Sequence, residues 1–370
     1  QPAQGRRHRV PRASRHDARR VMPTPIRVKF LARTPVDQDP ALWLSLFLER
    51  QPRLGHCEFI FDMDARDYDW LVVYEDLTFL PGEKRSNRSE KLACPRENTL
   101  FITTEPTSIK IYGPHYLRQF GHVMTVQPPH IIDHPNQIFE TPPLRWYYGR
   151  PLSADDNHYI DIDTYLETPP LEKTAQLSAV CSDKQMTPTL KQRYDFTAGL
   201  KAKLGDDFDW FGRGIRPISD KAEAMDSFRY HIAIENHIEP HHWTEKIADC
   251  YLAYCLPFYY GPPDISDYFP EDSYIPIDIF DPDGAADIIK NAIENGEYEK
   301  RLPAIIEARR RVLTDYNLMR SIAQTVKTRH NPSALVKPNQ YIYGRHIFRH
   351  KHPVAAARDA VHKARHSAKT

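Results

Sequence analysis

The sequence predicts an α/β protein built of two Rossmann-like domains that face one another across a cleft. Short apolar segments alternate with amphipathic ones from about residue 24, which is the pattern of βαβ units. A proline-rich stretch near the middle of the chain interrupts this alternation. With 370 residues, 41% of them hydrophobic, the chain is long enough for about two domains with cores of their own.

The first predicted domain covers residues 24–150. Its apolar segments are rich in β-branched and aromatic residues, which favour strands, and Pro106 ends one of them. Helices are expected at 41–51 and, as a shorter element, at 114–121. Strands are expected at 26–32, 57–63, 69–76, 98–106 and 122–127.

A proline-rich linker is expected at 151–174, and a second domain at 175–330. The second domain repeats the alternation of the first, so it too is expected to contain βαβ units. Strands at 177–183, 208–214, 230–236 and 256–263 would alternate with helices at 190–204, 221–228, 244–255, 283–295 and 298–316.

The chain has 50 Lys and Arg against 49 Asp and Glu, but the charges are unevenly distributed. Residues 1–24 and residues 345–370 each carry a charge of +6, which leaves the 320 residues between them near −11. We predict a disordered basic segment at 1–23 and a basic tail at 331–370. A nucleic-acid binder normally carries its basic patch on the folded body, so this layout argues against nucleic acid as a partner.

The two basic ends have two interpretations. Each cation near an anionic leaflet contributes about 1 kcal/mol, so the ends could hold the protein peripherally at the inner membrane. Alternatively, they are solvated and disordered. The five cysteines are scattered without a CxxC pair, as in proteins of a reducing cytosol, and no apolar run approaches the ~20 residues that span a bilayer. We therefore predict a cytoplasmic protein.

One helix start in the second domain has the features of an anion site. The strand at 230–236, its loop, the helix at 244–255 and the strand at 256–261 form one βαβ unit, and ligands of such units lie beyond the carboxyl ends of the strands. Backbone N–H groups at a helix start bind phosphate, and Lys246 adds a positive charge. Glu245 can accept both hydroxyls of a ribose, so a nucleoside diphosphate would satisfy both residues. The alternative is that both belong to a solvated helix turn.

A longer motif contains this helix start. The segment IENHIEPHHWTEKIADCYLAYCLPFYYGPPDISDYFPEDSYIPID, which begins at Ile234, resembles the donor-binding region of the α-1,3/4-fucosyltransferases of glycosyltransferase family 10. The match extends from about Phe208 to Asp281, and a weaker one continues upstream into 69–77 and 98–106. The resemblance implies a bacterial-type soluble member of that family, with the two-domain GT-B fold, inversion at the sugar carbon and GDP-L-fucose as donor.

The resemblance also implies a glycan acceptor, which could be lipid-linked, and a role in the synthesis of cell-surface polysaccharide or lipopolysaccharide. No cofactor is required on this interpretation, and a divalent metal, if it acts at all, is not essential. Two alternatives stay open. One is the same fold with a different GDP-sugar donor, and the other is a nucleotide- or glycan-binding protein without catalysis. The oligomeric state is left open.

The family's TEK motif falls on Thr244, Glu245 and Lys246. By the resemblance, Glu245 would bind the ribose of the donor and Lys246 its phosphates. The aromatic residue before this motif is often Tyr and is Trp243 here. A Trp would keep a stacking surface for the donor but lose the hydroxyl group.

Two further donor contacts follow from the resemblance. The family's EN pair falls on Glu235 and Asn236, and Asn236 is expected to hydrogen-bond the donor. In the family, an Arg on the first helix of the donor domain lies three residues before an aromatic residue and seven before a Leu. Arg193, Phe196 and Leu200 have this spacing, so Arg193 is the candidate for phosphate binding. The alternative is that Arg193 is an exposed helix cation.

Glycosyl transfer also needs a base that takes the proton from the acceptor hydroxyl. Glu105 follows the run NTLFITT of the strand predicted at 98–106 and precedes Pro106, which keeps it extended at the carboxyl end of that strand. By the resemblance, this is where a family member carries its catalytic glutamate, and we assign Glu105 as the general base. Glu75 competes for this role because its strand ends at the same edge, but we expect it to support the site.

Two groups of residues suggest a metal site that we do not assign. The triplets at 62–64 and 161–163 contain paired Asp residues, but such triplets arise easily by chance. The predicted cations would also neutralise a diphosphate without a metal. His237, His241 and His242 lack the Cys or acidic residue that would complete a zinc site at suitable spacing. We therefore assign no metal ligand.

Overall fold

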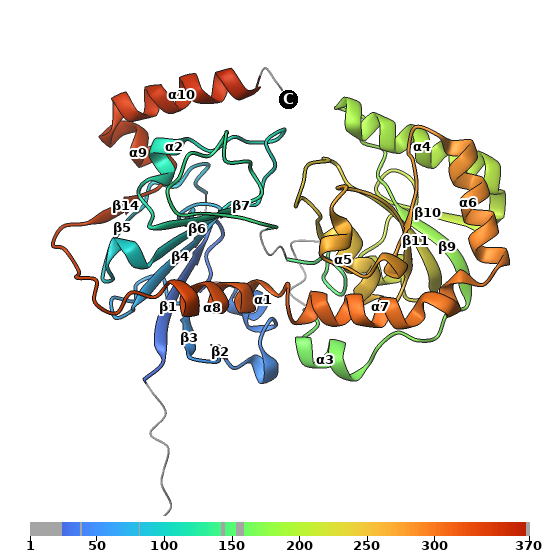
Figure 1. Ribbon diagram of the computed structural model, residues 1–370, viewed down its shortest axis with the longest axis horizontal. Helices are drawn as coiled ribbons and strands as arrows, with labels where there is room; N and C mark the ends of the chain where they lie inside the picture. The colour runs from blue at the N-terminus through green and yellow to red at the C-terminus, as the bar shows by residue number, and fades with distance from the viewer. Residues whose placement is uncertain (1–23, 38, 81, 142–144, 153–158, 368–370) are drawn as a thin grey trace, which may run out of the picture.

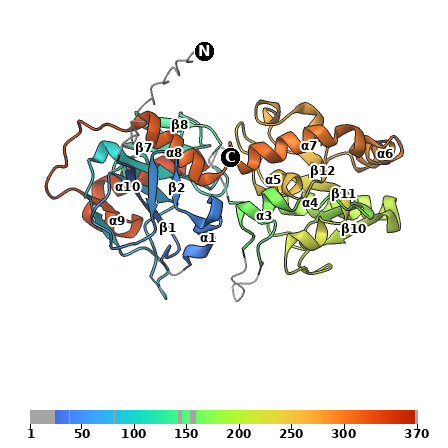
Figure 2. The same cartoon turned by 90° about the horizontal axis from the view of Figure 1, so that it is seen from below.

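A computed structural model describes residues 24–367 except 38, 81, 142–144 and 153–158. The predicted basic segment at 1–23 lies outside the described residues. The described chain forms two α/β lobes, each with its own sheet, which lie side by side (Figures 1 and 2). The predicted α/β architecture with two Rossmann-like domains is confirmed.

The sheet of the first domain has the strand order β2-β3-β1-β4-β6-β7-β8. All neighbours pair in parallel except β2 with β3. The central strands β4, β6 and β7 are buried along their whole length, as is usual for a parallel sheet covered on both faces. The bounds are β1 Ile26–Ala32, β2 Arg53–Leu54, β3 Cys57–Ile60, β4 Trp70–Tyr74, β6 Thr99–Ile102, β7 His122–Thr125 and β8 Gln137–Phe139.

Helix α1 is shorter than predicted. It covers Pro40–Leu44, whereas the sequence pattern predicts a helix over 41–51. Phe47 is extended and fully buried against Phe59, and the backbone of Glu49 then takes a left-handed φ of 51°. Burial of the Phe47 ring therefore ends the helix that the periodicity favours.

The second domain has an all-parallel sheet with the order β10-β9-β11-β12-β13. Helices α4 and α6 pack on one another, as do α5 and α7, and the strands lie between these two pairs (Figure 1). The strand bounds are β9 Ala175–Val180, β10 Phe208–Phe211, β11 Phe228–Ile234, β12 Leu256–Tyr260 and β13 Ile275–Pro276. The helix bounds are α4 Pro188–Leu204, α5 Glu245–Leu252, α6 Pro282–Glu294 and α7 Glu297–Leu313.

The segment between the domains is anchored to the second domain. Backbone N–H groups of Tyr147 and Tyr148 donate to Asp249 of α5, at 2.9 and 3.1 Å. The predicted linker at 151–174 also contains a short helix, α3, at Ile162–Glu167. The crossover between the domains is therefore held by hydrogen bonds to buried groups.

The C-terminal part of the chain, predicted as a basic tail at 331–370, folds back onto the first domain. After α8 (Leu318–Arg329), the chain returns to the first domain, where β14 (Tyr341–Tyr343) pairs with β5 (Ser89–Lys91) in antiparallel fashion. Two helices follow and cover α2, as Figure 1 shows: α9 at Arg345–Lys351 and α10 at Pro353–Ser367, with α2 at Pro114–Leu117.

The reason for this return is that the basic segment also carries apolar and ion-pairing groups. Phe348 is 5% exposed and its ring lies 5.6 Å from that of Tyr116. Arg345 Nε lies 2.7 Å from the buried carboxylate of Asp76. Charge composition alone hides both contacts. Within the described ranges, no helix is long and apolar enough to cross a membrane.

The return of the C-terminal segment can be tested by stability. Phe348→Ala should lower the free energy of unfolding by about 3 kcal/mol, because a buried aromatic ring is removed. Val354→Ala is the matched control on the same segment, since Val354 is 66% exposed, and it should change stability by less than about 0.5 kcal/mol. Chemical denaturation measures both. Equal, small effects would contradict the packing of α9 on the first domain.

Candidate active site

The topology of each sheet places its ligand-binding edge at the cleft between the domains. In the second sheet, the strand order reverses between β9 and β11, and ligands of such sheets bind beyond the carboxyl ends of the strands at this point. A cavity of about 390 Å³ lies there. Its lining includes Ser182 after β9, Gly212 and Arg213 after β10, Arg193 of α4, and Glu245 and Lys246 of α5.

Gly212 shows how close the backbones approach in this cavity. Its φ is +142°, and a Cβ built there would lie 2.3 Å from the carbonyl oxygen of Cys181. A larger residue would have to push the strand ends apart, so the cavity depends on glycine at this position.

A buried carboxylate fixes the start of α5. Glu235 directly follows β11 and is 1% exposed. Its Oε1 accepts from the backbone N–H of Thr244 at 2.9 Å and its Oε2 from the Thr244 hydroxyl at 2.6 Å. The same Oε1 accepts from the Tyr259 hydroxyl at 3.1 Å. Thr244 is the N-cap of α5, so Glu235 determines where the helix begins.

Two lysines surround Glu245 in the first turn of α5. Lys246 Nζ lies 3.1 Å from Glu245 Oε1 and 3.5 Å from Glu235 Oε2. Lys221 Nζ lies 2.5 Å from Asp249 Oδ2, one turn further along the helix. Burial alone would raise the pKa of Glu245, but the charges of Lys246 and Lys221 outweigh it and bring this pKa to about 2. Glu245 is therefore ionised throughout the physiological range.

The first domain contributes two carboxylates to the other side of the cleft. Glu105 lies beyond the end of β6 and is partly buried, and Gln127 Nε2 donates to its backbone carbonyl at 2.9 Å. Burial raises the pKa of Glu105, and the nearby charge of Glu75 raises it further. Glu75 has a left-handed φ of 72° and accepts from the Thr104 hydroxyl at 2.5 Å. Glu75 thus contributes to the raised pKa of Glu105 and binds the side chain of the residue before it.

The two sides meet in one cavity of about 400 Å³ between the domains. Glu105 lines it together with Lys246, and the lining continues into the second-domain cavity because Glu245 and Lys246 belong to both. From the first domain it includes Tyr74, Glu75, Thr104, Glu105, Pro106, Ser108, Ile109, Arg145 and Tyr147. From the second it includes Glu235, Asn236, His237, His242, Thr244, Glu245 and Lys246.

One hydrogen bond crosses the cleft close to Glu105. The Thr107 hydroxyl, two residues after Glu105, donates to Glu239 Oε1 at 2.5 Å. Glu239 belongs to the loop between β11 and α5, and its other oxygen lies 3.1 Å from His237 Nε2. The loop that carries Glu105 is therefore joined to the loop that leads into the start of α5.

The structure brings most of the predicted site residues together. Glu105, Glu235, Asn236, Glu245 and Lys246 line the interdomain cavity, and Arg193 lines the adjoining one. The Arg193 guanidinium donates to the side-chain oxygen of Asn236, which joins α4 to the end of β11. The carboxylate of Glu235, however, is occupied by Thr244 and Tyr259, so its contacts organise the protein itself.

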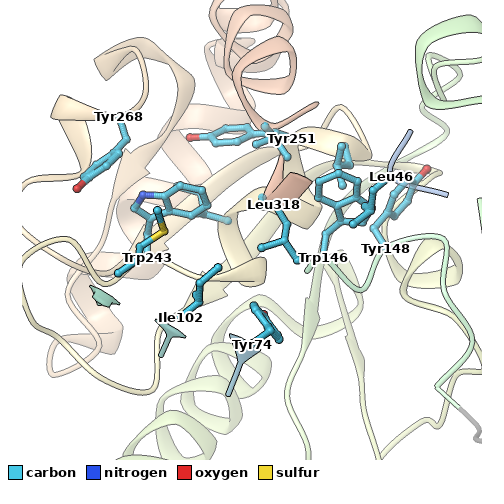
Figure 3. Close-up of a cluster of buried hydrophobic side chains, with 14 of the residues drawn as sticks. Leu46, Tyr74, Ile102, Trp146, Tyr148, Trp243, Tyr251, Tyr268 and Leu318 are labelled. Atoms are coloured by element: carbon cyan, nitrogen blue, oxygen red, sulfur yellow. The ribbon is translucent and has the colours of Figure 1, made fainter. Parts of the chain in front are cut away.

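Trp243 is not in either cavity lining, which corrects the expectation that it stacks on a donor. It is 5% exposed, and its ring lies 5.0 Å from Phe269 and 5.1 Å from Tyr316. Figure 3 shows it in a buried cluster to which both domains contribute, with Ile102 and Tyr74 from the first and Tyr268 from the second. An apolar residue just before an N-cap commonly packs inward, and this preference determines its position.

Several residues of the site were not predicted from the sequence. Lys221 pairs with Asp249, which lies one helical turn after Glu245 on α5. Arg145 lines the cleft, and its guanidinium group lies over the Trp43 ring. Arg213 could have been found, because it directly follows a strand that ends at the ligand edge. The others carry no local signal, since their partners are distant in the chain.

The histidines and paired aspartates do not converge. His237 lies near Glu239, whereas His241 Nδ1 lies 2.9 Å from Asp264 and 2.5 Å from the Tyr268 hydroxyl. Asp161 pairs with Arg50, at 2.8 Å, at the edge of the linker. Among the described residues, no group of three or more His, Cys, Asp or Glu side chains is arranged to hold a metal ion.

The depressed pKa of Glu245 predicts an acid-sensitive contribution to stability. The unfolded-state pKa of Glu is ~4.3, so ionised Glu245 stabilises the folded protein above that pH, and this contribution is lost as the pH falls towards 2. Glu245→Gln should therefore lose stability less steeply than wild type in that window. The exposed Glu271→Gln is the control. Equal slopes for wild type and Glu245→Gln in acid denaturation would contradict the buried charge network.

Comparison with known proteins finds a family match in the second domain. Residues 171–300 match the model of glycosyltransferase family 10 (fucosyltransferase), C-terminal part. No curated protein sequence matches the chain.

Two solved structures of α1,3-fucosyltransferase are similar in shape, each with a TM-score of 0.48. One is 16% identical in sequence, and the alignment covers 85% of this chain and 92% of the solved chain. The other, determined with GDP-fucose, is 14% identical and covers 86% and 94%. At this level of likeness nothing about activity follows from the shape. The family match lies in the second domain and contains Glu235, Glu245 and Lys246, so this part of the chain is similar to the C-terminal part of the fucosyltransferases of glycosyltransferase family 10.

Proposed function

We propose that the protein transfers L-fucose from GDP-L-fucose to a hydroxyl group of a glycan, with inversion at the sugar carbon. The proposal rests on one observation: Glu105 of the first domain and Lys246 of the second line the same cavity. A base on one side and a phosphate-binding cation on the other are what an in-line displacement of GDP requires.

The donor would occupy the two joined cavities. Its diphosphate would bind at the start of α5, where backbone N–H groups and Lys246 meet it, and Arg193 would approach it from α4. The ionised Glu245 would accept from the ribose hydroxyls. Lys246 now contacts Glu235 and Glu245, so a bound diphosphate would compete for its charge. As GDP departs, these cations would stabilise its growing negative charge, usually the largest catalytic contribution.

Glu105 would act as the general base. Its raised pKa brings it closer to the working pH, which improves proton abstraction from a hydroxyl group. The acceptor hydroxyl would then attack from the face opposite GDP. We propose a glycan acceptor, free or lipid-linked, and a role at a cell-surface glycan precursor on the cytoplasmic side. Peripheral contact with an anionic membrane through the basic ends belongs to the same proposal.

Substitution of Glu105 tests the chemistry. Glu105→Gln should reduce kcat about 10²–10⁴-fold while the calorimetric affinity for GDP-L-fucose stays unchanged, because only the base is lost. Glu75→Gln is the matched control. It should retain turnover, with the acid limb of its pH–rate profile moved to lower pH, since one cause of the raised pKa of Glu105 is gone. The assignment of Glu105 as the general base would be contradicted if Glu105→Gln kept full activity, or if activity were lost in Glu75→Gln but not in Glu105→Gln.

The hydrogen bond across the cleft should affect turnover through alignment. Glu239→Ala removes the acceptor of Thr107 and should lower kcat about tenfold, the cost of one lost hydrogen bond. Glu239→Gln keeps a side-chain carbonyl and should restore most of it. Adding Thr107→Val to Glu239→Ala should cost little more, because the two residues share one interaction. Additive losses in steady-state kinetics, or a Gln variant as impaired as Ala, would show that the bond does not position Glu105.

A further inference from the structure

A separate cavity lies on the first domain, between α2, α9 and α10. It measures about 440 Å³ and shares no lining residue with the two cavities of the active site. Its charged lining consists of Arg345 and Arg349 of α9 and Asp359 and Lys363 of α10. Three cations thus face one carboxylate.

The carboxylate of Asp359 is already fully engaged. Oδ1 accepts from the backbone N–H of His115 at 2.9 Å and lies 2.8 Å from its Nδ1, and Oδ2 accepts from the backbone N–H of Tyr116 at 3.0 Å. Gly113 makes this approach possible, since a Cβ there would lie 2.2 Å from Asp359 Oδ2. Asp359 therefore fastens α10 to the first turn of α2.

Lys363 is left without the partner that its position would normally provide. It follows Asp359 by four residues on α10, a spacing at which opposite charges usually pair on a helix. In the described part of the chain, the side chains of Lys363 and Arg349 make no hydrogen bond or ion pair, whereas Arg345 is paired with Asp76. Burial lowers the pKa of Lys363 and the neighbouring charges of Arg349 and Arg345 lower it further, which together outweigh the opposing effect of Asp359.

Lys363 is partly buried beside the like charges of Arg349 and Arg345, and such an arrangement costs free energy unless an anion offsets it. We propose that this cavity binds a phosphate group, carried either by a soluble phosphorylated compound or by the headgroup of an anionic phospholipid. A phosphate offers several oxygens at once, which suits one Lys ammonium and one Arg fork that approach from two helices. By joining α9 to α10, the bound anion would stabilise the C-terminal segment on the first domain. This inference does not depend on the proposed transfer reaction.

The test measures thermal unfolding of the full chain in increasing inorganic phosphate at constant ionic strength, with chloride as the balancing anion. Phosphate should raise the unfolding midpoint of wild type in a saturable way, and the rise should be lost in Lys363→Gln/Arg349→Gln. Arg358→Gln is the matched control, because Arg358 is exposed on α10 and does not line the cavity. The rise should persist in this control and also in Lys246→Ala, whose change lies in the active site.

If the double variant does not fold, Arg349→Gln alone serves, since Arg349 is exposed. Sedimentation with vesicles then identifies the source. Binding to vesicles of phosphatidylglycerol but not of phosphatidylcholine, lost in the cavity variant and kept in Arg358→Gln, indicates a lipid headgroup. Phosphate stabilisation without vesicle binding indicates a soluble phosphorylated compound. No stabilisation by phosphate, or equal stabilisation of wild type and the cavity variant, would overturn the proposal.

Discussion

The site depends on one buried carboxylate. Glu235 joins the end of β11 to the N-cap of α5 through Thr244, and it also lies 3.5 Å from Lys246 Nζ. A charge buried to this degree is costly unless it is fully hydrogen-bonded, and here three donors from protein groups satisfy it. Loss of this carboxylate would therefore release the helix start and the lysine together, so stability and function share the same interaction.

Contacts between residues distant in the sequence also support the two domains at the cleft. Asp249, on the helix that begins at Thr244, holds the crossover segment through Tyr147 and Tyr148 and pairs with Lys221. From the other side, the C-terminal segment returns to the first domain, where Arg345 pairs with Asp76, the neighbour of Glu75. Both lobes of the cleft are thus supported by segments distant in sequence. The geometry of the cleft therefore depends on contacts made along the whole described part of the chain.

These distant contacts explain what the sequence could predict. The strand pattern predicts β1 at its observed bounds, and a strand end and a helix start mark Glu105 and Lys246 as candidates, which line one cavity. The Lys221–Asp249 and Thr107–Glu239 pairs join residues 28 and 132 positions apart, which no local pattern reports. Trp243 was assigned to the donor because it precedes the TEK motif, but packing draws its ring inward. The basic charge of the C-terminal segment concealed Phe348 and its place in the fold.

The central claim is that the start of α5 binds the diphosphate of a GDP-sugar, and calorimetric titration of GDP tests it most directly. The account predicts that Lys246→Ala weakens GDP binding about 10–100-fold, the worth of one charge-assisted interaction. Lys191→Ala, an exposed cation on α4 paired with Asp195, should leave the affinity unchanged. Titration with GDP-L-fucose, GDP-mannose and UDP-glucose then shows which sugar and which nucleobase the donor site prefers. Equal affinity of wild type and Lys246→Ala for GDP would contradict the account.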